Sequence, residues 1–129
     1  MKNRLSIHGL LLSTLLGQGA CAAPGTGFAP EAQLIPAKAL QERLAGKTYT
    51  AQVANGSGWE MRYEANGLMH MTVSNGSADR GRWRTEDNRL CVDFEGKFPS
   101  GCSEMRADGK QLYLKRASSG EVVTLTPTP

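Results

Sequence analysis

From Lys47 onward, apolar and polar residues alternate with a period of two, in short runs separated by turn residues. This alternation is typical of strands that bury one face and expose the other. The dipeptide Asn66-Gly67 is a strong hairpin signal between two such runs. The pattern predicts strands over about 48–53, 59–64, 68–73, 80–85, 89–94, 102–107, 111–116 and 121–125.

About eight short strands joined by tight turns predict a mainly β fold, an antiparallel up-and-down meander. Its edges can be removed by closure into a small barrel, which we expect here, or by folding into a sandwich. One short helix should precede the strands. Pro36 suits a helix start, Leu40 and Leu44 share one face, and Gly46 suits the position after the last turn.

The hairpin around Trp83 separates its two faces clearly. Gly81, Trp83 and Thr85 fall on one face of the strand, while three arginines fall on the other. We therefore expect the Trp83 ring to be buried at one end of the barrel. Gly81 has no side chain, so a neighbouring backbone can approach it closely.

The outward arginines, together with one just across the turn, form what we call the arginine row: Arg80, Arg82, Arg84 and Arg89. One interpretation is a solvated face, partly neutralised by Asp93 or Glu104 on neighbouring strands. The other is a contact surface for an acidic partner, such as an anionic envelope polymer or the acidic rim of an envelope protein. Guanidinium groups suit both carboxylates and phosphates.

Cys91 and Cys102 become direct neighbours on adjacent antiparallel strands if residues 95–100 form the end of a hairpin. Side chains in such opposed positions are close enough to form a disulfide. The alternative is two free buried thiols, as in a reduced compartment. The export signal described next favours the disulfide.

The N-terminus has the features of a secretory signal. Lys2 and Arg4 precede an apolar run from Ile7 to Leu16, and Ala20-Cys21-Ala22 fits a small-x-small cleavage site. The alternative is a lipoprotein with Cys21 lipidated, although Gln18 departs from that motif. The expected organisation is a signal at 1–22, a flexible arm at 23–35, a barrel domain with its helix at 36–126, and a tail at 127–129.

Removal of the signal changes the charge balance. The whole chain has 15 basic and 12 acidic residues, and Lys2 and Arg4 leave with the signal. The remaining excess of one positive charge gives no reason to expect nucleic-acid binding. Membrane attachment is expected only if Cys21 is lipidated.

Candidate chemistry is sparse. His70 is the one histidine outside the signal, and no spacing of His, Cys and carboxylates suits a zinc site. A lone histidine does not define the shared geometry that a catalytic triad needs. We expect neither a cofactor nor an enzyme. The large side chains on the inward faces form either a filled core or a pocket lining: Trp59, Met61, Tyr63, Met69, Met71 and Trp83. A filled core is expected, because aromatic residues make up only 6% of the chain.

Several short motifs resemble those of small exported bacterial proteins of unassigned function. They are Leu44-Ala45-Gly46-Lys47-Thr48-Tyr49, Gly81-x-Trp83, Leu90-Cys91-Val92, Cys102 and Asp108-Gly109. The resemblance implies a lipocalin-like, or calycin-like, barrel. A weaker likeness is to the protease-inhibitor barrels of bacterial periplasms. True lipocalins carry G-x-W on their first strand, whereas Trp83 lies mid-chain.

These observations together lead us to expect a non-catalytic binding or inhibitory module of the bacterial cell envelope, in the periplasm or outside the cell, and monomeric. The alternatives are a small-ligand carrier of lipocalin-like type and a small envelope hydrolase.

Export gives a first testable prediction. N-terminal sequencing of the exported protein should begin at Ala23 or within a residue or two of it, because cleavage is expected after Ala22. Metabolic labelling of Cys21 with a fatty-acid analogue would instead show a lipoprotein anchored through that residue.

Overall fold

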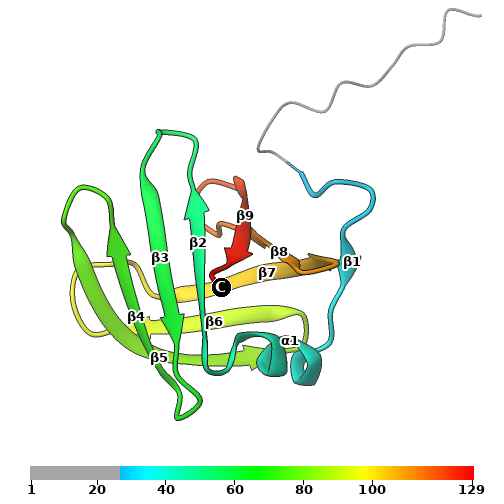
Figure 1. Ribbon diagram of the computed structural model, residues 1–129, viewed down its shortest axis with the longest axis horizontal. Coiled ribbons are helices and arrows are strands. Elements are labelled where there is room, and N and C mark those ends of the chain that lie inside the picture. Colours follow the sequence, from blue (N-terminus) through cyan, green and yellow to red (C-terminus); the bar gives the residue numbers. More distant parts are fainter. Residues whose placement is uncertain (1–26) are drawn as a thin grey trace, which may run out of the picture.

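The computed structural model describes residues 27–129 (Figure 1). The predicted signal at 1–22, Cys21 and the first four residues of the predicted arm lie outside the described residues. The elements, in chain order, are β1 (Gln33–Leu34), α1 (Ala37–Leu44), β2 (Lys47–Gln52), β3 (Gly58–Tyr63), β4 (Leu68–Val73), β5 (Ala78–Glu86), β6 (Arg89–Phe94), β7 (Gly101–Asp108), β8 (Gln111–Lys115) and β9 (Val122–Pro127).

Strands β2 to β9 form a closed antiparallel barrel. Each strand pairs with the next in sequence, and the last strand, β9, pairs back onto the first, β2. Because the barrel is closed, each strand from β2 to β9 has a hydrogen-bonded neighbour on both sides, and none is an edge strand. The predicted eight-stranded up-and-down barrel is therefore confirmed.

The segment before the helix differs from the predicted flexible arm over its described part. Gln33 and Leu34 form β1, which pairs with Ala107 and Arg106 of β7. That part of β7 extends past the end of β6, whose first residue, Arg89, pairs with Glu104. β1 fills this free edge, and the flanking side chains of Ala32 and Ile35 are buried. A strand of two residues is too short to show a period in the sequence.

Helix α1 closes one end of the barrel (Figure 1). Leu40 and Leu44 are fully buried, as their spacing of four predicts. Two hydrogen bonds attach the helix backbone to the strands. The Thr85 hydroxyl donates to the carbonyl of Ala37 at 3.0 Å, and the Tyr49 hydroxyl donates to the carbonyl of Arg43 at 2.7 Å.

The Trp83 ring lies at this closed end and is 7% exposed, as its strand position predicts. Its indole N–H donates to the carbonyl of Glu64 at 2.9 Å. The ring meets that of Tyr63 edge to face, with centroids 5.6 Å apart, and Tyr63 meets Tyr49 in the same way at 6.2 Å. Such pairs add to the stabilisation from burial.

Gly81 of β5 lies directly against the backbone of β6. A Cβ atom at this position would lie 2.2 Å from the carbonyl oxygen of Asp93, so no side chain fits. The close backbone approach expected at Gly81 is therefore present, and it brings β5 against β6 two residues before Trp83.

The predicted disulfide between Cys91 and Cys102 is confirmed, and the two residues are direct partners across β6 and β7. It lies on the outer face of the sheet. Cys91 is nevertheless only 1% exposed, although it lies on the strand face opposite to the inward residues Leu90 and Val92. Cys102 is bonded to Cys91, and a carboxylate oxygen of Glu86 lies 3.6 Å from the sulfur of Cys91.

The C-terminal tail corrects one expectation. Residues 127–129 were expected to form a tail after the last strand, yet β9 continues through Pro127, and the N–H of Thr128 donates to the carbonyl of Thr48 at 2.9 Å. Pro127 lies opposite Tyr49, at a position where the backbones of β2 and β9 are not hydrogen-bonded to each other. Its missing N–H therefore removes no bond to β2.

The packing of Trp83 leads to a prediction. Replacing Trp83 by Ala should lower the free energy of unfolding by about 3–5 kcal/mol, because it opens a cavity at the closed end. Trp83→Phe keeps an apolar ring but leaves the Glu64 carbonyl without its donor, so about 1–3 kcal/mol should be lost. Urea denaturation measures both. An unchanged midpoint for Trp83→Ala would contradict the role of this ring.

Candidate ligand-binding cavity

A cavity of about 500 Å³ occupies the end of the barrel opposite α1. Its apolar wall consists of inward side chains of β3, β4, β6 and β8: Trp59, Met61, Tyr63, Met69, Met71, Val73, Leu90, Val92, Phe94 and Leu114. The rim is formed by the loop between β6 and β7 and by the turn between β8 and β9.

The expectation of a filled interior is correct for one end of the barrel and wrong for the other. Around α1, side chains such as Leu40, Tyr49 and Met105 are 0–1% exposed and fill the space. Toward the open end, the inward positions of β7 are Gly101 and Ser103, which are too small to reach the opposite wall. A hollow remains between these two small residues and the opposite wall.

Five of the six residues predicted to line a core or pocket do line the cavity. Met61, Tyr63 and Met69 are nearly fully buried and form its inner part, while Trp59 and Met71 are partly exposed. The sixth, Trp83, packs at the closed end instead. Methionine side chains are flexible and polarizable, so this lining can adapt to different apolar shapes.

Polar groups gather on one side of the cavity. Ser100 lies just before β7 and Ser103 lies near its start, while Arg116 and Ser118 belong to the turn that follows β8. In the strand order, β7 and β8 lie across the barrel from β3 and β4, which carry the methionines. An apolar wall therefore faces a partly polar one.

Arg116 was not selected from the sequence, although the alternation of Leu112, Leu114 and Arg116 places all three on one strand face. Its guanidinium lies over the Trp59 ring, 5.0 Å from the centroid. It also donates to the Glu121 carboxylate at 2.9 Å. The cation–π contact fixes both side chains at the rim of the cavity.

Glu121 joins two turns at the same rim. Besides the bond from Arg116, it accepts the backbone N–H of Ala54, in the turn after β2, at 2.6 Å. These two donors hold the pKa of Glu121 below its ordinary value, although partial burial acts in the opposite direction. The charged form of Glu121 is therefore the one that holds the turns together.

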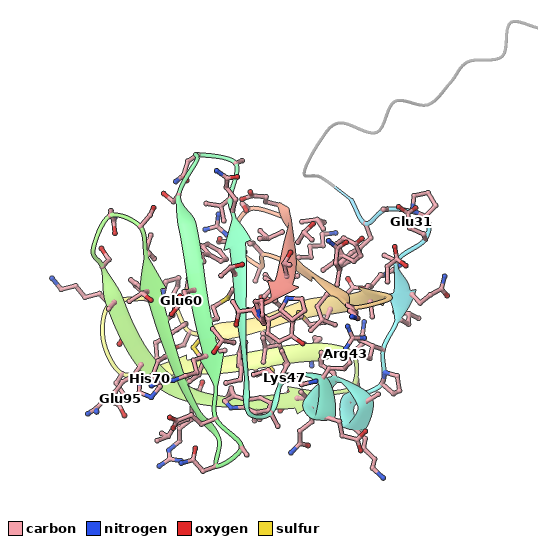
Figure 2. The ribbon with its side chains drawn as sticks, viewed as in Figure 1. Glu31, Arg43, Lys47, Glu60, His70 and Glu95 are labelled. Atoms are coloured by element: carbon pink, nitrogen blue, oxygen red, sulfur yellow. A yellow bond between two sulfur atoms is a disulfide. The ribbon has the colours of Figure 1, made fainter. Side chains whose placement is uncertain are left out.

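His70 lies on the outer face of β4, away from the cavity, as its place between Met69 and Met71 predicts (Figure 2). Its side chain is 39% exposed, and the nearest carboxylate oxygen, from Glu64, is 3.7 Å away. The histidine and the cavity are on opposite faces of the sheet, so this pair and the hollow do not form one site.

The arginine row is largely paired with carboxylates. Arg80 bonds Glu95 at 2.8 Å, and Arg84 bonds Asp93 at 2.8 Å, one of the two neutralising partners suggested by the sequence. Glu86 lies between Arg84 and Arg89, at 3.2 and 3.7 Å. Within residues 27–129, only Arg82 of this row has no carboxylate within 4.0 Å. The second suggested partner, Glu104, contacts Arg106 instead.

A grouping of metal-ligand residue types occurs once in the described part of the chain, at Glu86, Cys91 and Cys102. The two sulfurs are bonded to each other, so they are not available as thiolate ligands.

No family model, curated protein or solved structure matches this chain. The closed eight-stranded antiparallel barrel with a disulfide is compatible with a lipocalin-like barrel. Over residues 27–129, the one helix is too short and too polar to span a membrane.

The Glu121 contacts predict a specific response to acid. Its pKa is lower in the folded than in the unfolded chain, so its stabilisation is complete above the ordinary glutamate pKa of 4.5 and is lost as the pH falls through the folded value. Glu121→Gln should cost about 1–2 kcal/mol at pH 7 and much less at pH 2.

Melting temperatures of wild type and Glu121→Gln between pH 2 and pH 7 measure this difference. Glu60→Gln is the matched control, because Glu60 lies on the exposed outer face of β3 (Figure 2). A difference between Glu121→Gln and wild type that stays constant with pH would contradict the assignment.

Proposed function

We propose that this chain is a non-catalytic binding barrel of the bacterial cell envelope that takes a small, largely apolar molecule into its open end. The observation that carries the proposal is the cavity of about 500 Å³ with its apolar lining. Small-molecule sites in proteins are typically hollows of roughly this size, mainly apolar, with a few polar groups that orient the ligand.

The design of the barrel supports a carrier role. One end is sealed by α1 and by the aromatic rings of Trp83, Tyr63 and Tyr49, so a molecule enters and leaves through the other end. Eight strands enclose just enough space for one small ligand when part of the interior is left unfilled. The asymmetric lining suits an amphipathic molecule with its apolar part against β3 and β4 and its polar edge toward Ser103 and Arg116.

The resemblance to small exported proteins with lipocalin-like barrels belongs to this proposal. In its support, Gly81 and Trp83 form a close strand contact and a sealed barrel end. The disulfide is typical of proteins in an oxidising compartment, which agrees with export. We propose a periplasmic or extracellular monomer, attached to a membrane only if Cys21 is lipidated.

A role in binding or inhibiting a protein or anionic polymer through the arginine row has less support. Three of its four members already contact carboxylates, and exposed pairs of this kind leave little net charge for a partner. The cavity therefore defines the proposed function better than the outer surface does.

The test is a titration of the purified mature protein with the uncharged fluorophore N-phenyl-1-naphthylamine. We expect saturable binding at one site per chain. Ser103→Leu should weaken it at least tenfold, since the added side chain projects into the hollow from an inward position of β7. Thr72→Leu adds a comparable apolar group on the exposed face of β4 and should bind as wild type does.

Absence of saturable binding by the folded wild-type protein would overturn the proposed function. Equal affinity of Ser103→Leu and wild type would show that the fluorophore binds elsewhere on the molecule.

A further inference from the structure

The loop between β6 and β7 covers one side of the cavity mouth. Phe98, Pro99 and Ser100 of this loop are part of the cavity lining. The Phe98 ring meets Phe94 edge to face, with centroids 5.5 Å apart. We call residues 96–100 the rim segment. It supplies an aromatic wall at the point where a ligand would pass.

Asp79, on the neighbouring strand β5, holds the rim segment through backbone hydrogen bonds. Its carboxylate accepts the N–H of Gly96, at 3.0 and 3.2 Å to its two oxygens, and the N–H of Phe98 at 3.0 Å. It also accepts the N–H of Arg80 at 2.8 Å. Partial burial acts to raise the pKa of Asp79, but these donors outweigh it and lower the pKa overall.

The contact between Asp79 and the rim segment requires that residue 96 have no side chain. A Cβ atom at Gly96 would lie 2.7–2.9 Å from the carboxylate atoms of Asp79. Any side chain there would therefore push the carboxylate away from the N–H groups that it accepts. Asp79 and Gly96 thus provide two independent ways to disturb the same contact.

The two ends of the rim segment are attached by other means. The N–H of Phe94 donates to the Ser100 hydroxyl at 2.8 Å, and the disulfide joins the strands below it. The exposed ion pair of Arg80 with Glu95 lies at the other end. Within the rim segment itself, the backbone N–H groups of Gly96 and Phe98 donate to Asp79, and neither of them donates to a backbone carbonyl of the described residues.

We propose that the rim segment is a lid on the ligand cavity and that Asp79 is the positioning residue that holds it over one side of the mouth. Breaking the carboxylate contacts frees Phe98 to swing away, so that a bound apolar molecule exchanges faster. This inference rests on the proposed function, because a lid has a role only where the cavity takes a ligand.

The experiment compares wild type with Asp79→Ala, Asp79→Asn and Gly96→Ala, and uses Asp93→Asn as the matched control. Asp93 is a carboxylate on the outer face of β6 that pairs with Arg84 and does not contact the lid. Two quantities are measured on the full mature chain: the dissociation rate of N-phenyl-1-naphthylamine by stopped flow, and the amide hydrogen exchange of Gly96 and Phe98.

Asp79→Ala should raise the dissociation rate at least tenfold and the association rate as well, so that affinity changes less than either rate. Exchange at Gly96 and Phe98 should accelerate, while the core strands keep their protection. Asp79→Asn and Gly96→Ala should shift both quantities in the same direction by smaller factors, and Asp93→Asn should match wild type. Gly96→Ala keeps the carboxylate, so it tests the lid even if Asp79→Ala does not fold.

Three outcomes would overturn the inference in different ways. Unchanged exchange at Gly96 and Phe98 in the variants would show that Asp79 does not hold the segment. Faster exchange with an unchanged dissociation rate would show that the segment is held by Asp79 but does not control the mouth. No fluorophore binding by the wild type would overturn the proposed function itself, and the lid with it.

Discussion

Closure of the barrel depends on a short seam between its first and last strands. Among the described residues, β2 and β9 pair through Tyr49 with Pro127 and Thr50 with Thr126, extended by the bond from Thr128 to Thr48. Without this seam, both strands would present free edges and the interior would open to water. The seam lies at the end of β2 nearest α1, where the interior is also filled.

Beyond the seam, the two strands separate, and an outer polar groove lies between them, lined by Thr50, Ala51, Gln52, Val122, Thr124 and Thr126. In this region the strand ladder ends, and Glu121 connects the two sides instead. It accepts the N–H of Ala54 and a hydrogen bond from Arg116. The same region of the barrel is hollow. Side-chain contacts rather than strand pairing therefore organise the mouth, with Glu121 on one side and Asp79 on the other.

The two ends of one barrel thus differ in what holds them. The closed end depends on buried apolar and aromatic groups, including Leu40, Tyr63 and Trp83. The open end depends on carboxylates that accept backbone N–H groups from loops. Apolar burial is independent of pH, whereas these carboxylate bonds need the ionised form. A rigid base and an adjustable mouth are consistent with a barrel that takes up and releases a small molecule.

The sequence by itself determined the eight barrel strands, the hairpins and the helix, because each depends on local pattern, and together with the export signal it favoured the disulfide. Period-two alternation places Trp83 inward and His70 outward, and counting along one hairpin places Cys91 opposite Cys102. The tertiary structure decided what depends on separate strands meeting: the edge taken by β1, the hollow beside Gly101 and Ser103, and the contacts of Asp79 and Glu121. A pattern along one strand shows which face a side chain takes, but the space in front of that face is set by strands far away in the sequence.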